Sequence, residues 1–341
     1  MNGTISQKSN DSGCHVASLK ALLDNLVVPY KRGDKVGVKL HWGERGNESF
    51  LPPFYAREII RWLKGKKTKP FVWDTSVLYS GGRRTGKDSL ETAEEHGYTA
   101  DYLGCPIIMG DGEDSRDVLT VNAPFHHFNS FEVAAIIKKA EGFFIFSHFK
   151  GHIESGFAGS IKNLAMGFAS RAQKQLIHAD AHPVLNKNKC TKCGTCADLC
   201  PTGAVIMPAG KYPAYNLDLC TGCAQCIAMC PSIALKIFWA TSESVFQEKL
   251  VEAAAAAWNI ISYNSLVVNA LIGITKDCDC MTGHNPLIAP DMGFIGGYHP
   301  VTVDFESIKM TGEEVFNKAH RSVPWKRQFE YASQIGFVET F

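Results

Sequence analysis

The chain has little of what would direct a protein to a membrane, a nucleic acid or the cell exterior. Its 35 Lys and Arg residues nearly balance 34 Asp and Glu residues, and a net charge of +1 provides no electrostatic footprint for nucleic acid or a membrane surface. The most apolar late stretch, residues 265–275, is too short to span a bilayer. The first residues are polar and contain no apolar run typical of a secretory signal. We therefore expect a cytoplasmic protein.

Nucleotide-binding fingerprints are also missing. No G-x-G-x-x-G follows an expected strand, so nothing points to a nicotinamide or flavin site, although a flavin bound without a motif stays open. The glycine-rich segment 156–163 is not a Walker A loop, because no Gly-Lys-Ser/Thr follows at the required spacing.

Apolar runs and helical patterns alternate through most of the chain. Strands are predicted at 36–40, 71–74, 143–148 and 266–274, and helices at 53–64, 87–96, 131–140, 246–258 and 313–320. This order predicts an α/β fold with a mostly parallel sheet flanked by helices. The pattern breaks in the Cys-rich stretch. We therefore predict one α/β domain, residues 1–184 and 240–341, with a small α+β domain inserted at residues 185–239.

Eight of the 12 cysteines stand in two tight runs of the form C-x₂-C-x₂-C-x₃-C-P. In such a run three sulfurs converge on one cubane, while the fourth ligates the other cluster. One cluster is thus expected on Cys190, Cys193, Cys196 and Cys230, and the other on Cys220, Cys223, Cys226 and Cys200. Zinc is the alternative, but zinc sites usually take two pairs of ligands rather than four per run with a trailing Cys-Pro. The stretch 187–238 resembles bacterial ferredoxins with two [4Fe-4S] clusters.

A second set of motifs surrounds the cysteine runs. The stretch 150–167 reads K-G-H…G-x-x-G-x-x-K-N-L-x-M-G, and residues 39–41, 278–280, 288–293 and 299–304 add K-L-H, C-D-C, I-A-P-D-M-G and H-P-V-T-V-D. Together these stretches resemble the DUF362 family, whose members often carry a ferredoxin module. The resemblance implies an iron–sulfur redox protein and supports the architecture more than any particular reaction.

The glycine-rich segment 156–163 is expected to join a strand to a helix. Its free N–H groups and the helix dipole would suit a carboxylate or phosphate at the carboxyl ends of the strands. Lys39, Lys150 and Lys162 would hold that anion, and His41 or His152 would supply the proton that accompanies each electron. The alternative is a tight turn with glycines for close packing and lysines in solvent.

Cys278 and Cys280 form a further candidate site. Two thiols one residue apart can share a metal, completed by His41, His148 or His152, or can act as a redox pair or ligands of a third iron–sulfur centre. The alternative is two cysteines in a polar loop.

Three functions are consistent with these motifs. In the first, the module passes low-potential electrons to a small anionic substrate or a further centre in the α/β domain, making the protein an iron–sulfur oxidoreductase. The second is a pure electron carrier whose large domain docks a redox partner protein. The third is a maturation factor that delivers a metal or cofactor. A buried polar crevice between the 156–162 turn and the Cys278 loop would favour the first over the second, because a carrier needs none.

Overall fold

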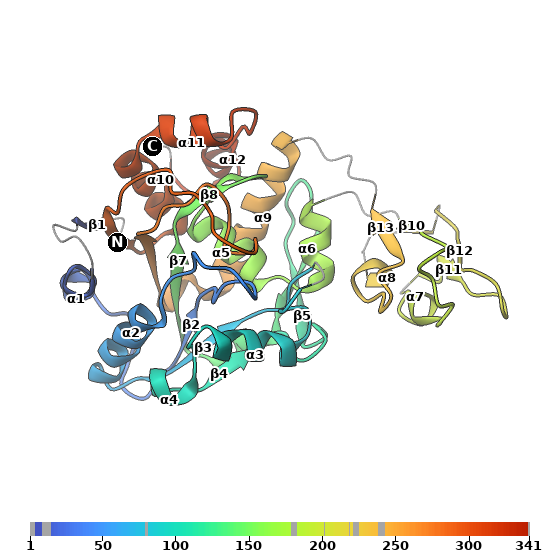
Figure 1. The fold of residues 1–341 in the computed structure, drawn as a ribbon, viewed down its shortest axis with the longest axis horizontal. Coiled ribbons are helices and arrows are strands. Elements are labelled where there is room, and N and C mark those ends of the chain that lie inside the picture. The colour runs from blue at the N-terminus through green and yellow to red at the C-terminus, as the bar shows by residue number, and fades with distance from the viewer. Residues whose placement is uncertain are drawn as a thin grey trace.

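The computed structural model describes residues 4–8, 15–78, 81–178, 183–200, 202–217, 219–220, 225–237 and 243–339. A seven-stranded sheet in the order β1-β15-β14-β7-β2-β3-β4 forms the centre of the larger body (Figure 1). Its strands are β1 (Thr4–Lys8), β2 (Lys35–Lys39), β3 (Lys69–Asp74), β4 (Ile107–Met109), β7 (Gly142–His148), β14 (Ser265–Leu271) and β15 (Gly293–Gly297). The strands β14, β7, β2, β3 and β4 are parallel, and β15 runs antiparallel between β14 and β1. The predicted α/β fold with a mostly parallel sheet is confirmed.

Both faces of the sheet are covered, which explains why its central strands are continuous apolar runs. In β7, Phe144 and Phe146 pack with helices α1 (Val16–Asn25) and α2 (Pro53–Gly65). Phe143 and Ile145 face the other way, toward α5 (Ser160–Phe168), α9 (Glu243–Ile261) and α10 (Pro300–Thr311). The period of two along a strand thus divides one apolar run between two cores. Strands β14 and β15, from the last third of the chain, complete the sheet that the first half begins.

The remaining elements lie around this sheet. They are α3 (Gly86–Glu95), α4 (Ala100–Leu103), β5 (Val118–Asn122), β6 (Ser130–Ala134), the 3₁₀ helix η1 (Ala135–Lys139), β8 (Lys150–His152), β9 (Gly156–Ala158), α6 (Arg171–His178), η2 (Ser262–Asn264), α11 (Glu313–Ala319) and α12 (Arg327–Gln334). Within the described ranges, no helix combines the length and apolar character needed to cross a bilayer.

One predicted helix is wrong. Residues 131–140 form strand β6 followed by η1, and β6 pairs antiparallel with β5. Phe131 and Val133 are buried while Glu132 between them is partly exposed, so the segment alternates with a strand period. Pairing with β5, together with the strand preference of Phe and Val, outweighs the helical pattern that the longer window suggests.

The described residues between 183 and 237 form a small lobe beside the larger body, called here the cysteine-rich lobe (Figure 1). Strand β10 (Pro183–Leu185) pairs with β13 (Leu235–Ile237), which brings the two ends of the lobe together. Strands β11 (Val205–Ile206) and β12 (Ala214–Tyr215) form a hairpin, with Gly210 at φ +70° in the connecting turn. The short helices α7 (Thr195–Asp198) and α8 (Gln225–Ala228) lie within the first and second cysteine runs.

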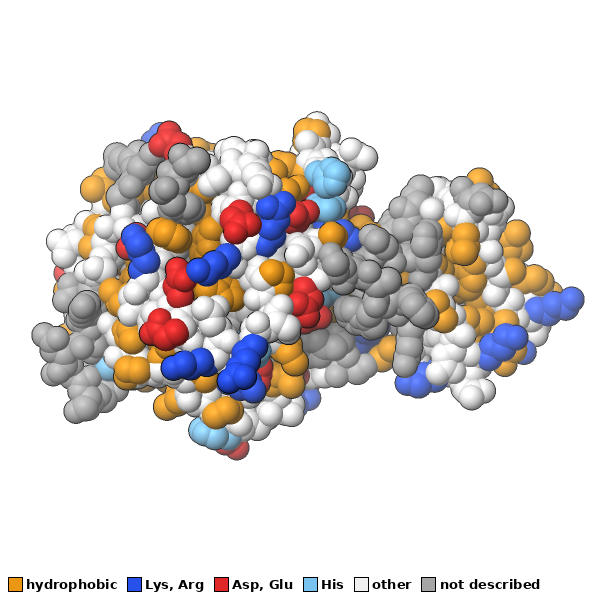
Figure 2. All heavy atoms as spheres, turned by 90° about the horizontal axis from the view of Figure 1, so that it is seen from above, with side chains coloured by type: hydrophobic (Ala, Val, Ile, Leu, Met, Phe, Trp, Pro, Cys, Tyr) orange, Lys and Arg blue, Asp and Glu red, His pale blue; other side chains and the backbone are white. Residues whose placement is uncertain are grey.

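The surface of the larger body mixes charges of both signs. In the view of Figure 2, Lys, Arg, Asp and Glu side chains are interspersed over the larger body. The visible side of the cysteine-rich lobe is apolar with several basic groups. Lys187, Lys189, Lys192 and Lys211 are exposed on the lobe, as are Ile206 and Leu217.

Candidate functional site

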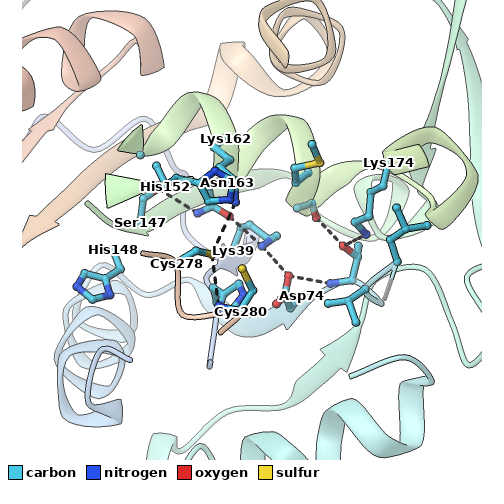
Figure 3. A pocket seen from close by; sticks show the side chains of 18 of the residues that line it. Lys39, Asp74, Ser147, His148, His152, Lys162, Asn163, Lys174, Cys278 and Cys280 are labelled. Atoms are coloured by element: carbon cyan, nitrogen blue, oxygen red, sulfur yellow. Dashed lines mark hydrogen bonds and ion pairs between the residues drawn. The ribbon is translucent and has the colours of Figure 1, made fainter. Parts of the chain in front are cut away.

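A crevice of about 220 Å³ opens at the carboxyl ends of the parallel strands. Lys39 ends β2, Asp74 ends β3 and His148 ends β7, so three strands each bring one polar side chain to this edge. The crevice is lined by every residue that the sequence assigned to a pocket: Lys39, His41, Lys150, His152, Lys162, Cys278 and Cys280. Figure 3 shows Lys162 and Asn163 on α5 close to Lys39, with Cys278 and Cys280 beside it.

A buried ion pair lies at the base of the crevice. Lys39 Nζ is 2.7 Å from Asp74 Oδ1 and donates to Asn163 Oδ1 at 2.9 Å. Arg83 approaches the other oxygen of Asp74 at 3.5 Å. Burial alone would raise the pKa of Asp74, but the charges of Lys39 and Arg83 outweigh it and lower this pKa to about 2. A methyl group at Gly167 would stand 2.4 Å from Lys39 Cε, so the glycine makes room for the lysine.

A second buried carboxylate anchors the loop that carries the two cysteines. Asp279 lies between them and is 0% exposed. It contacts His148 Nδ1 at 2.9 Å and Lys150 Nζ at 2.8 Å. These two side chains lower the pKa of Asp279 far below its usual range, against the effect of burial. Lys150, expected to hold a substrate anion, is therefore engaged by the protein itself.

His41 is poorly suited to the predicted role of proton donor. Its Nδ1 accepts from the Gly43 N–H at 2.9 Å, and its Nε2 is 2.7 Å from Arg83 Nη1. Burial and the charge of Arg83 lower the pKa of His41 to about 3. The ring is therefore neutral near pH 7.

His152, Cys278 and Cys280 come together in the wall of the crevice. Their donor atoms all lie within 4.8 Å of one another, and such a group could hold a metal ion. Lys162 Nζ is 3.8 Å from Cys278 Sγ, and the Cys280 N–H donates to the same sulfur at 3.4 Å. His152 Nδ1 accepts backbone N–H groups from Glu154 and Ser155 at 3.2 and 3.1 Å.

The expected anion site at the start of α5 is already filled by a carboxylate of the chain. Asp304, on α10, accepts the N–H groups of Ser160 and Ile161 at 2.7 and 2.8 Å. A methyl group at Gly159 would stand 2.3 Å from Asp304 Oδ1, so this glycine serves close packing. The prediction that these N–H groups are free for a substrate is wrong, because a residue far along the chain takes them.

In the cysteine-rich lobe, Cys190, Cys193, Cys196 and Cys230 line one small pocket. The Lys192 N–H points at Cys190 Sγ at 3.4 Å, and the Ala234 N–H points at Cys230 Sγ at 3.3 Å. Backbone N–H donors to thiolate sulfur are what an iron–sulfur cluster needs, so this donor set fits the group that the spacing implies.

The second predicted ligand set is described in part. Cys226 packs on the same small apolar cluster as Cys190 and Cys196, formed around Ile227 and Leu235. Cys200 and Cys220 are partly buried. The fourth member, Cys223, lies outside the described residues.

The lobe contacts the larger body through Arg84. One nitrogen of its guanidinium, Nη2, donates to the Cys230 carbonyl at 3.3 Å, and Nη1 donates to the Leu78 carbonyl at 3.1 Å. Leu78 lines the crevice. Arg171 Nη1 lies 3.8 Å from Met229 Sδ at the same junction. A predicted cluster ligand is therefore one side chain away from the crevice wall.

The model of a family described as "Domain of unknown function (DUF362)" matches residues 36–309, most of the chain. The chain belongs to the DUF362 family. No curated protein matches this DUF362 chain.

Two solved structures match parts of the DUF362 chain. The lactate racemase apoprotein from Thermoanaerobacterium thermosaccharolyticum has 12% identity and a TM-score of 0.38, over 76% of this chain and 49% of that one. A protein from Thermotoga maritima has 12% identity and a TM-score of 0.45, over 94% of this chain and 58% of that one. The DUF362 chain thus spans about half the length of these structures.

Sequence reasoning missed four charged residues of the DUF362 crevice: Asp74, Arg83, Glu154 and Lys174. Asp74 had a readable signal, since it is the polar last residue of the strand predicted at 71–74. Lys174 had none, because α6 carries it to Thr75 Oγ1, 2.9 Å away, from a distant part of the chain. Burial lowers the pKa of Lys174 to about 8.

Proposed function

We propose that this protein is an iron–sulfur electron-transfer protein whose cysteine-rich lobe holds two [4Fe-4S] clusters and supplies low-potential electrons to a ligand or centre in the crevice. Residues 185–239 form the ferredoxin-like domain, and residues 1–184 and 240–341 form the α/β domain that binds the acceptor. The observation that carries the proposal is the pocket in which Cys230, from the second run, joins Cys190, Cys193 and Cys196 from the first. Each cluster, when bound, would accept and release one electron.

The protein's own groups have defined tasks in this scheme. Cysteine thiolates hold each cluster, and the N–H groups of Lys192 and Ala234 stabilise the negative charge on sulfur. Arg84 keeps the lobe against the larger body by donating to Cys230 and Leu78. The acceptor site is thereby held close to the lobe.

The crevice favours an acceptor site over a pure electron carrier. Lys39, Asp74, Lys150 and Asp279 are buried at or next to it, and burying charges is costly even when they are paired. A carrier that only docks a redox partner protein has no use for such a site. Retaining these charges is consistent with a small polar ligand that is bound and reduced there.

A second candidate, a role in metal or cofactor maturation, is favoured by the group of His152, Cys278 and Cys280. It predicts a labile metal in addition to the irons of the lobe. Replacing Cys278 and Cys280 together by Ser should remove that metal and leave the iron content unchanged.

The test is anaerobic purification of the full chain, with iron and sulfide counts and electron paramagnetic resonance after reduction. We expect about eight irons and eight sulfides per chain. Cys230→Ser should lower the cluster content, whereas Cys105→Ser, at a buried cysteine of the α/β domain, should leave it unchanged. Colourless protein that holds zinc alone, or no metal, would overturn the proposal.

A further inference from the structure

We infer that Cys278 and Cys280 are a redox-active dithiol, with Cys278 as the attacking thiolate and Cys280 as the resolving thiol, acting on a small disulfide in the crevice. The inference deepens the proposed function by naming a two-electron acceptor. It depends on the proposed function only for the source of the electrons.

The backbone brings the two sulfurs together. The Met281 N–H donates to the Cys278 carbonyl at 3.0 Å, which closes a tight turn over residues 278–281. The sulfurs lie within 4.8 Å of each other, and both cysteines line the crevice. Asp279 between them does not line it and is bound to His148 and Lys150, so the turn is anchored from behind. Close sulfurs on an anchored turn are the geometry that a reversible disulfide requires.

The surroundings of Cys278 favour a thiolate. Lys162 Nζ is 3.8 Å from its sulfur, and the Cys280 N–H donates to it at 3.4 Å. A hydrogen bond from the Cys280 thiol lowers the pKa of Cys278 well below its usual value, and Lys162 lowers it further, against the effect of burial. The same hydrogen bond raises the pKa of Cys280 well above its usual value. One thiolate beside one thiol is the arrangement of an attacking and a resolving cysteine.

His152 acts as a hydrogen-bond donor to this thiolate rather than as a metal ligand. Its Nδ1 accepts the N–H groups of Glu154 and Ser155, so the proton of the neutral ring resides on Nε2. If a metal bound Nε2, the ring proton would have to move to Nδ1. Two backbone N–H groups already point at Nδ1, so a proton there would face two donors. The His152 ring bonds Cys278, which further lowers the pKa of the thiol, although the hydrogen bond of Cys280 has the larger effect.

The reaction balances as thiol–disulfide exchange. The Cys278 thiolate attacks one sulfur of the small disulfide, that S–S bond breaks, and one thiolate leaves. Cys280 then attacks the mixed disulfide, and the second thiol leaves with the proton of Cys280, so that Cys278 and Cys280 are oxidised to a disulfide. Two electrons, one from each cluster of the proposed function, and one proton return the pair to thiolate and thiol. The crevice volume of about 220 Å³ suits a small disulfide and not a folded protein.

The first test is iodoacetamide labelling of the anaerobically purified full chain, read at each cysteine by peptide mass spectrometry. At about pH 6, Cys278 should react at least about tenfold faster than Cys280 or Cys105. Lys162→Met should slow Cys278 by about tenfold, and Lys162→Arg should restore most of the rate, because each unit of thiol pKa changes the thiolate fraction about tenfold. Equal labelling rates of Cys278 and Cys280 would overturn the inference.

The second test equilibrates the protein with mixtures of oxidised and reduced dithiothreitol. One peptide should then carry an internal Cys278–Cys280 disulfide, and Cys280→Ser should instead trap a mixed disulfide at Cys278. A metal site would show itself in two ways: a chelator would be needed before the two cysteines can be labelled, and the double Cys→Ser variant would lose one metal per chain. That result would refute the dithiol. Iron and sulfide are counted in the same samples. If the disulfide forms but the protein contains no iron, only the proposed function is refuted. If the protein contains iron but no disulfide forms, only the inference is refuted.

Discussion

Replacing Lys39 by Met should destabilise the fold by about 3 kcal/mol, because it leaves the Asp74 carboxylate buried without its closest cation. The side chains of Lys39 and Asp74 are 1% and 3% exposed and 2.7 Å apart. Removing one partner of a buried pair typically costs about 3–5 kcal/mol, and Arg83 at 3.5 Å keeps the value at the lower end. The lowering of the Asp74 pKa from 3.8 to about 2 supports this size, since it corresponds to about 2.5 kcal/mol.

The assay is urea unfolding followed by circular dichroism at about pH 7. Lys20→Met is the matched control: Lys20 is 58% exposed and 3.3 Å from Glu58, and its loss should cost less than about 1 kcal/mol. The double variant Lys39→Met/Asp74→Asn should be more stable than Lys39→Met, because the carboxylate that lost its closest cation is no longer charged. Equal costs for the Lys39 and Lys20 variants, or additive effects of Lys39→Met and Asp74→Asn, would refute the reasoning.

The same pair predicts a pH dependence. A carboxyl whose pKa is lowered by folding binds its proton more readily in the unfolded chain, so its stabilisation is complete above the unfolded pKa near 3.8. That stabilisation is lost as the pH falls toward about 2. The stability difference between the native protein and the Asp74→Asn variant should therefore shrink over this window.

Three further outcomes are expected. Burial and a nearby arginine lower the pKa of His41 to about 3, so its NMR signals should not titrate between about pH 5 and 8. A titration midpoint near 6.5 would contradict the neutral state of the ring. Gly151→Ala should destabilise by more than about 2 kcal/mol, because a methyl group would stand 2.1 Å from the Lys276 carbonyl, whereas Gly65→Ala, with open space around it, should change stability by less than about 0.5 kcal/mol in urea unfolding. Asp304→Asn should cost about 2 kcal/mol, since an amide cannot accept both N–H groups of the first turn of α5; a neutral effect would mean that the carboxylate does not cap this helix.

Local patterns were sufficient for the architecture, and they predict the cysteine chemistry. Strand and helix periods and turn glycines act over a few residues, so the α/β alternation and the turn at Gly210 can be read directly. The cysteine runs predict their ligand sets for the same reason, because each loop holds three sulfurs within seven residues. Part of the composition of the crevice was also predictable, since parallel strands deliver their following residues to one edge.

Only the tertiary structure decided which of these polar groups are free. Lys150 is bound by Asp279, and the start of α5 is capped by Asp304, in both cases by residues more than a hundred positions away. The first part of the helix predicted at 131–140 is instead strand β6, which pairs with β5. The spacing of residues along the sequence does not reveal such distant partners, because the energy of a buried charge depends on the groups that folding places beside it. The amino-acid sequence determined which chemistry the chain carries, and the packing of distant segments decided which groups remain available to use it.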